Sequence, residues 1–239
     1  MIIKEITEIL ESFAPLEYAE DFDNVGLLVG DPKIEVTGVL ITLDTLESVV
    51  EEAITKNCNL IVSFHPIIFS GLKKLTGRNY VERVVIKAIK HGIAIYSIHT
   101  ALDNHFNGVN ARICEVLGLG NRKVLLPKKG VLKKLTTYVP LKQAESLRAA
   151  LFEAGAGHVG NYSHCSFSSE GKGSFKGESE SNPTIGERGK LHEEEEIQLH
   201  ITYTRDLEKK VLSALFDAHP YEEVAYEVIT LDNSYQQIG

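Results

Sequence analysis

The chain has 239 residues, which is enough for one large domain or two ordinary ones with a buried core. Apolar residues make up 43% and charged residues 24%, a balance that argues against wholesale disorder. The net charge of −8 argues against general binding to nucleic acids or anionic membranes, because both need a positive field. No secretory signal and no apolar run of about 20 residues is seen, and the three cysteines form no CxxC pair, so we expect a cytoplasmic protein with reduced thiols.

The first half of the chain alternates helical and strand patterns. Apolar side chains at helical spacing predict helices over residues 3–13, 46–57, 80–91 and 109–117. Short apolar runs predict buried strands over residues 36–44, 59–64 and 93–98. Strands that alternate with helices at this spacing imply parallel strands with right-handed crossovers. We therefore expect residues 1–125 to form a parallel-sheet α/β layer.

The pattern changes after a basic, Pro- and Gly-containing boundary at residues 120–131. Strands are expected over residues 132–139, 197–203 and 224–231, with helices over residues 142–154 and 207–218. This order predicts a ferredoxin-like α+β domain over residues 131–235. The polar, glycine-rich residues 170–196 are expected to form an exposed loop between two strands, as part of a mobile hairpin, with Glu193–Glu196 as a solvated approach to a strand.

Two histidines directly follow apolar strands of the first half. His65 follows residues 59–64, and His99 follows residues 93–98. The carboxyl ends of parallel strands meet at one edge of a sheet, and Asp103 is near enough to His99 to reach the same pocket. Two imidazoles and a carboxylate suit Zn, Fe, Mn or Ni. The alternative is that these are ordinary polar residues at strand ends, since neither spacing is a specific zinc motif.

Three segments together resemble the NIF-three-like family, also described as GTP cyclohydrolase I type 2 homologues: FDNVGLLVGD, SFHPIIF and IHTALDNHFNGVN. The resemblance implies a dinuclear centre of divalent transition metals, two per complete site, inside a ring-shaped homohexamer. It implies His65, His99 and Asp103 as metal ligands, with Asp103 bridging the metals. Phe64 stands where the family usually has a further histidine.

The segments GAGHVGNYSHCSF and AHPYEEVAY resemble the domain inserted in longer family members, which is similar to the PII and CutA folds. We therefore expect residues 131–235 to be that insert, and the C-terminal half of the family fold to be absent. His219 and Glu223 have the spacing of the family's last ligand pair. We assign them to the insert instead, where Pro220 ends a helix.

Three functions stay open. The first is a metal-dependent hydrolase that acts on a nucleotide-like or other small substrate, with metal-activated water and His105 as a candidate proton carrier. The second is a non-catalytic metal- or ligand-binding, or regulatory, protein. The third is an incomplete fragment of the family fold. No catalytic residue is assigned, and no cofactor-binding residue is expected beyond the metal ligands.

Overall fold

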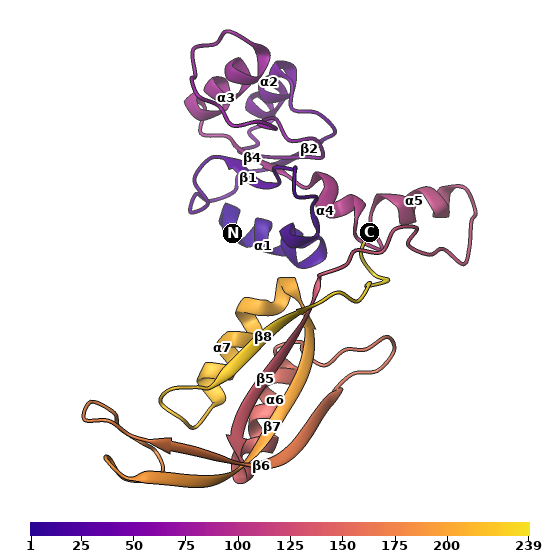
Figure 1. The fold of residues 1–239 in the computed structure, drawn as a ribbon. Helices are drawn as coiled ribbons and strands as arrows, with labels where there is room; N and C mark the ends of the chain where they lie inside the picture. Colours follow the sequence, from indigo (N-terminus) through magenta and orange to yellow (C-terminus); the bar gives the residue numbers. More distant parts are fainter. The chain divides into compact units, whose positions relative to one another are not determined.

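A computed structural model describes all residues, 1–239, and divides into two compact units. Unit 1 comprises residues 1–127 and 236–239, and unit 2 comprises residues 128–235. Each unit contains its own four-stranded sheet (Figure 1). No helix of the chain is both long enough and apolar enough to cross a membrane. All three cysteines are free thiols.

Unit 1 is an α/β layer. Its strands are β1 (Gly26–Val29), β2 (Val39–Thr42), β3 (Leu60–Ser63) and β4 (Ala94–Ser97). Its helices are α1 (Ile3–Phe13), the short 3-10 helix η1 (Leu16–Tyr18), α2 (Glu47–Thr55), α3 (Tyr80–Lys90), α4 (His99–Asp103) and α5 (Val109–Val116). The sheet order is β1-β4-β3-β2, in which β2, β3 and β4 are parallel and β1 is antiparallel to β4.

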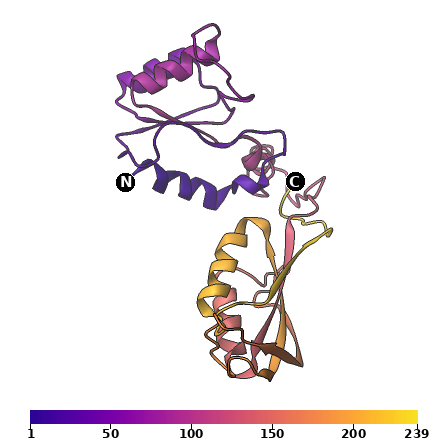
Figure 2. The same cartoon turned by 60° about the vertical axis from the view of Figure 1, so that its left-hand side comes forward.

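The two central strands, β3 and β4, are buried on both faces of the sheet. Ile61 and Ile95 pack against α2 and α3, whereas Leu60, Val62 and Tyr96 pack toward α1. Figure 2 shows α1 (indigo) on one side of this sheet and the α2–α3 pair on the other. Continuous apolar runs are typical of parallel strands with helices on both faces, which explains why these two strands were readily predicted.

Helix α3 shows how the sequence fixes an element boundary. The Asn79 side chain accepts a 2.9 Å hydrogen bond from the backbone N–H of Glu82, which satisfies a donor that the first turn leaves free. Gly92 follows the helix with φ +65°, a left-handed conformation that glycine adopts without strain. The chain can therefore turn at once into β4, whose carboxyl end leads to His99.

Two details of unit 1 differ from the prediction. The expected buried strand over residues 36–44 is the short edge strand β2, and Ile41 on it is 80% exposed. An apolar run alone does not distinguish a central strand from an edge strand with one uncovered face. Strand β1 was not expected at all, because its four residues contain a glycine and too few positions to show a period.

Unit 2 has the strand-helix-strand-strand-helix-strand order of a ferredoxin-like fold. Its strands are β5 (Leu132–Pro140), β6 (Ser166–Lys176), β7 (Leu191–Thr204) and β8 (Tyr226–Leu231). Its helices are η2 (Leu141–Gln143), α6 (Ala144–Glu153), η3 (Arg205–Leu207) and α7 (Glu208–Ala218). The sheet order is β6-β7-β5-β8, with every neighbouring pair antiparallel. The predicted mixed α/β fold class is thus confirmed in both units.

The two helices of unit 2, α6 and α7, bury one face of its sheet. Leu147 and Leu151 of α6 and Leu215 of α7 are fully buried with Leu135 and Leu199 of the central strands. Because side chains alternate along a strand, the neighbouring residues of β5 and β7 point to the opposite face. That second face bears polar and aromatic side chains.

The expected exposed loop over residues 170–196 is wrong for most of its length. Residues 170–176 belong to β6, residues 191–196 belong to β7, and only residues 177–190 connect the two strands. The strands pair in register from Ser166–Ile201 to Lys176–Leu191. Glycine, serine and charged residues conceal the strand period, but backbone pairing in a long hairpin overrides their weak strand preference.

Candidate metal centre

The three parallel strands of unit 1 end at the same edge of the sheet. Thr42 of β2 lies opposite Ser63 of β3, which in turn lies opposite Ser97 of β4. The hydrogen bonding continues beyond the last strand residues, because His99 donates its backbone N–H to the Phe64 carbonyl at 3.0 Å and His65 donates to the Leu43 carbonyl at 2.9 Å. The residues that follow each strand are therefore held side by side.

His65 is oriented by a carboxylate from the neighbouring strand end. Its Nδ1 lies 2.7 Å from Asp44 Oδ1, and both side chains are about half exposed. A carboxylate only accepts hydrogen bonds, so Nδ1 carries a proton, and in the neutral imidazole Nε2 then carries the free lone pair. Asp44 was not singled out from the sequence, although an acidic residue directly after a strand that neighbours His65 was the available signal.

His99 is oriented in the same way by a more deeply buried carboxylate. Its Nδ1 lies 2.8 Å from Asp23 Oδ2, and the Asp23 side chain is fully buried. Burial raises the pKa of Asp23, but hydrogen bonds from Thr100, His99 and the backbone N–H of Asn24 outweigh it, and the net pKa lies below its usual value. Asp23 therefore stays ionised and fixes the His99 ring with Nε2 free.

Asp21, Asp23 and Asn24 lie in the loop before β1, where short polar side chains either form a turn or reach a metal. Asp23 does form a turn, since its carboxylate accepts from the Asn24 backbone N–H at 2.8 Å. Its principal partners, however, are His99 and Thr100, which lie far away in the sequence. A carboxylate behind a histidine is the usual second layer of a metal site, where it sets the tautomer and the ring orientation.

The two imidazoles lie close together at this edge. Their ring centroids are 5.4 Å apart and the planes are inclined by 75°. The Phe64 ring contacts both of them edge-on, with centroid distances of 5.1 Å to His65 and 5.4 Å to His99. The three rings thus form a triangle of nearly equal sides, and the Phe64 ring offers no lone pair to a metal.

Asp103 completes the predicted trio from α4, one helical turn after His99. Burial raises the pKa of its carboxyl, while the nearby His99 and His65 act in the opposite direction and Asp23 adds to the rise. Neither oxygen of this carboxylate accepts a hydrogen bond from the chain. Asp103 is therefore a half-buried carboxylate with unused acceptor capacity, coupled electrostatically to both histidines.

The donor types at this edge suit a divalent transition metal, with two free imidazole nitrogens and one unpaired carboxylate. The positions of these side chains fit a metal site less well than their donor types do. Nowhere does the chain gather three or more His, Cys, Asp or Glu side chains around a point where they could hold a metal ion. The assignment of His65, His99 and Asp103 as joint ligands therefore stays a prediction.

The other histidines singled out from the sequence have different surroundings. The His105 ring packs against Phe13 at 4.8 Å and against Tyr18 at 6.1 Å, and its burial lowers its pKa. In unit 2, His219 uses both ring nitrogens: Nε2 pairs with the Tyr138 carbonyl at 3.0 Å, and Nδ1 accepts from the Tyr221 N–H at 3.2 Å. His219 therefore has no free nitrogen for a metal.

Comparison with known proteins identifies relatives of this chain. A family model described as Duf34/NIF3 (NGG1p interacting factor 3) matches residues 1–224. A Bacillus subtilis (strain 168) protein named "GTP cyclohydrolase 1 type 2 homolog" is 43% identical over 237 residues, which cover 99% of this chain and 64% of the relative. A protein of the same name from Halalkalibacterium halodurans is 40% identical over 235 residues, covering 98% of this chain and 63% of the relative.

Solved structures agree with these sequence matches. The crystal structure of a Bacillus cereus protein related to NIF3 superposes with a TM-score of 0.81 at 42% identity, covering 100% of this chain and 64% of that one. The chain thus spans about 64% of the length of the relatives it matches. Because the family model matches nearly the whole chain and the solved relative shares its fold, this chain belongs to the Duf34/NIF3 family.

Proposed function

We propose that unit 1 binds a divalent transition metal through Nε2 of His65, Nε2 of His99 and the carboxylate of Asp103, and that the protein is a metal-dependent hydrolase of a small, nucleotide-like substrate. The observation that carries this proposal is the pair of carboxylate–histidine contacts. Asp44 and Asp23 each hold one ring by Nδ1, so both free nitrogens belong to the fixed tautomer that metal ligands use.

The two carboxylate–histidine pairs favour a metal site over the alternative that His65 and His99 are ordinary polar residues at strand ends. A histidine that merely ends a strand needs no carboxylate behind it, and Asp23 is buried at a cost that its hydrogen bonds must offset. Two such pairs follow different strand ends, and their rings lie 5.4 Å apart at one edge of the sheet. Asp103 adds a negative charge where a cation would be stabilised.

The chemistry follows from these donors. A divalent metal held there would supply Lewis acidity, which polarises a carbonyl or phosphoryl oxygen of a substrate. The chain's own contribution would be to fix the imidazoles, to keep the Asp103 carboxylate available and to present the site at an open sheet edge. The relatives' name, "GTP cyclohydrolase 1 type 2 homolog", supports a purine nucleotide as the first substrate to test.

The number of donors bears on the predicted dinuclear centre. Three residues suffice for one open metal site, but two metals that need about four ligands each require further donors. Phe64 contacts both histidines and supplies none. We propose one well-held metal from these residues, with a second metal and a homohexameric assembly as the fuller form that the family resemblance implies.

A non-catalytic metal- or ligand-binding protein is the second candidate. The observation that favours it is the absence of a gathered three-residue ligand group. A weakly held ion would serve in sensing or in structure as well as in catalysis. The two candidates differ in whether the loaded protein turns over a substrate.

Turnover by metal-loaded protein separates the candidates. The 239-residue chain would be stripped with a chelator, loaded with Mn²⁺, Zn²⁺ or Fe²⁺, and incubated with GTP and a panel of small phosphate esters. We expect hydrolysis that requires added metal and falls by at least about 100-fold in Asp103→Asn, because the metal loses an anionic ligand. Metal binding without turnover of any substrate would favour the non-catalytic candidate.

A further inference from the structure

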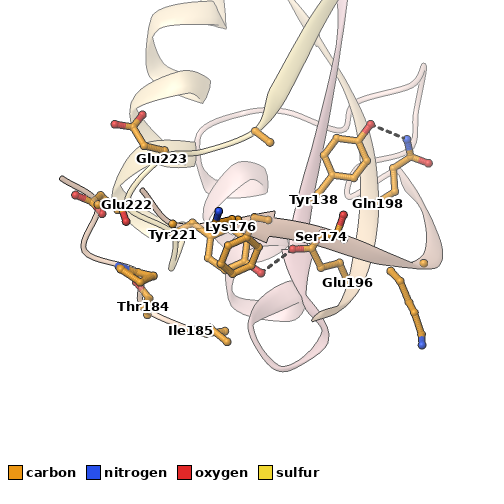
Figure 3. Close-up of a pocket in the computed structure, with 18 of the residues that line it drawn as sticks. Tyr138, Ser174, Lys176, Thr184, Ile185, Glu196, Gln198, Tyr221, Glu222 and Glu223 are labelled. Carbon is orange, nitrogen blue, oxygen red and sulfur yellow. Dashed lines mark hydrogen bonds between the residues drawn. The ribbon is translucent and has the colours of Figure 1, made fainter. Parts of the chain in front are cut away.

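Unit 2 contains a pocket on the sheet face that α6 and α7 do not cover. Its volume is about 540 Å³, within the range of sites that bind small molecules. The floor is formed by β5, β6 and β7, and one wall by the connection between β6 and β7 (Figure 3). Two hydrogen bonds tie that connection to the turn after α7: Asn182 N–H donates to Glu222 at 2.7 Å, and the Thr184 hydroxyl donates to the Pro220 carbonyl at 2.9 Å.

Glu196 is the buried charge of this pocket. It is only 8% exposed, yet no lysine or arginine pairs with it. Its Oε1 accepts a 2.6 Å hydrogen bond from the Tyr221 hydroxyl, and no group of the chain donates to Oε2 (Figure 3). Oε2 is not sealed off from the pocket, so a cationic ligand that enters there would find an acceptor that the chain itself leaves unused.

The backbone of β6 makes room for this carboxylate. Gly173 lies beside Glu196 on the same face, and a Cβ at residue 173 would come within 2.1 Å of Glu196 Oε2. The glycine is therefore required for the Glu196 side chain to lie across the strand. Along β7, Glu193 and Glu195 are exposed while Glu196 is buried. The expectation that Glu193–Glu196 would all be solvated is therefore wrong for Glu196.

The remaining lining combines aromatic surface with an excess of negative charge. Tyr221 packs against Phe175 with ring centroids 5.8 Å apart, and Tyr138 accepts a hydrogen bond from Gln198 at 3.2 Å. The charged residues that line the pocket are Glu170, Glu196, Glu222, Glu223, Lys172 and Lys176. Carboxylates outnumber ammonium groups, which disfavours an anionic ligand and favours a cation.

We propose that this pocket binds a small organic molecule in which a protonated amine is joined to an aromatic or apolar body. The amine donates to Glu196 Oε2 and forms the missing ion pair. The body lies against the Tyr221 and Phe175 rings, which also attract a nearby cation. The Tyr221 hydroxyl holds the carboxylate in place, so Glu196 needs no rearrangement to receive the ligand.

Titration of the full chain with tyramine and tryptamine, followed by amide NMR, tests this site. We expect saturable shifts confined to pocket residues for at least one amine. Tyrosol, which replaces the amine of tyramine with a hydroxyl, should bind at least about tenfold more weakly, because it cannot form a charge-assisted hydrogen bond. 4-Hydroxyphenylacetate, with a carboxylate in that place, should not bind.

Matched variants assign the effect to one carboxylate. Glu196→Gln keeps the shape and should lower the amine affinity by at least about tenfold. Glu195→Gln removes the same charge from an exposed neighbour on the opposite face of β7 and should leave the affinity unchanged. Gly173→Ala should also weaken binding, because the new methyl group displaces Glu196 Oε2.

Three outcomes would overturn the proposal. The first is that none of the amines binds saturably to a folded chain. The second is that tyrosol binds as tightly as tyramine, and the third is that Glu196→Gln and Glu195→Gln have equal effects. The amide spectrum of each variant serves as its own check of folding, and none of these results depends on metal binding in unit 1.

Discussion

The strand ends of unit 1 and the open sheet face of unit 2 both collect polar side chains, but they do so by different rules. In unit 1, each polar residue follows an apolar strand, so its position is fixed by parallel strands that end together. In unit 2, Glu196 is selected from a run of four glutamates by the pairing register of one hairpin. Strand order alone identifies the first kind of site, whereas the second requires the register.

Removing both imidazoles of unit 1 is expected to have the largest effect on metal binding. The double variant His65→Ala with His99→Ala should lower the affinity for Zn²⁺ or Mn²⁺ by at least about 100-fold, because two of the three donors are lost. Calorimetric titration of the chelator-treated chain measures the change. His91→Ala, which removes an exposed histidine at the end of α3, is the control and should titrate like the wild type.

Removing the carboxylate behind a ligand should have a smaller effect. Asp23→Asn keeps the turn but cannot accept the Nδ1 proton of His99 with the same strength, so metal affinity should fall by about 10–100-fold. Asp21→Asn changes an exposed neighbour in the same turn and should alter nothing. Equal metal affinities for Asp23→Asn and the wild type would show that the Asp23–His99 contact only shapes the turn.

The residues of the proposed metal site differ in how readily the sequence reveals them. His65 and His99 were found because each follows a short, mostly apolar run that forms a strand buried at every position, and Asp103 because it lies one helical turn after His99. Asp44 was missed because its importance depends on β2 lying beside β3, which spacing along the chain does not reveal. Elements with a strong period were located within a few residues, as in α1 and α3.

The features that escaped prediction share one physical cause. Strand β1, the outer part of β6 and the buried position of Glu196 all depend on pairing with a distant segment. Glycine and glutamate have little preference for strands, so only the ladder and the covering residues determine their conformation and burial. The resemblance to a family pointed to the proposed ligands in unit 1 but carried no information on the pocket in unit 2.

Placing a metal donor at residue 64 should strengthen metal binding by unit 1. In Phe64→His, an imidazole replaces the ring that contacts both histidines, and we expect metal affinity to rise by at least about tenfold. The same calorimetric titration measures it, with Phe64→Leu as the control for loss of the aromatic ring. No gain in Phe64→His would mean that residue 64 does not face the metal.

The smallest expected effect is a pH dependence of unit 2. Burial lowers the pKa of His219 below 6.5, only partly offset by the Tyr138 carbonyl and by Glu196, so the folded state favours the neutral ring. The unfolded chain therefore binds the proton first. The stability due to neutral His219 is fully present above 6.5 and is lost as pH falls from there through the folded-state pKa.

Urea unfolding at several pH values, followed through amide signals of unit 2, measures this dependence. We expect the free energy of unfolding to fall on acidification in the wild type and to fall less in His219→Gln. His158→Gln replaces an exposed histidine of the same unit and should keep the wild-type slope. Equal slopes in all three proteins would show that burial of His219 has no titratable effect.

The central claim is that the three strand-end residues share a metal ion, and a crystal of the metal-loaded protein tests it most directly. We expect an anomalous scattering peak bonded to Nε2 of His65, Nε2 of His99 and an oxygen of Asp103, each at roughly 2.0–2.2 Å. The Nδ1 contacts to Asp44 and Asp23 should persist in that crystal. A peak elsewhere in the chain, or none beside the two imidazoles at saturating metal, would contradict the account.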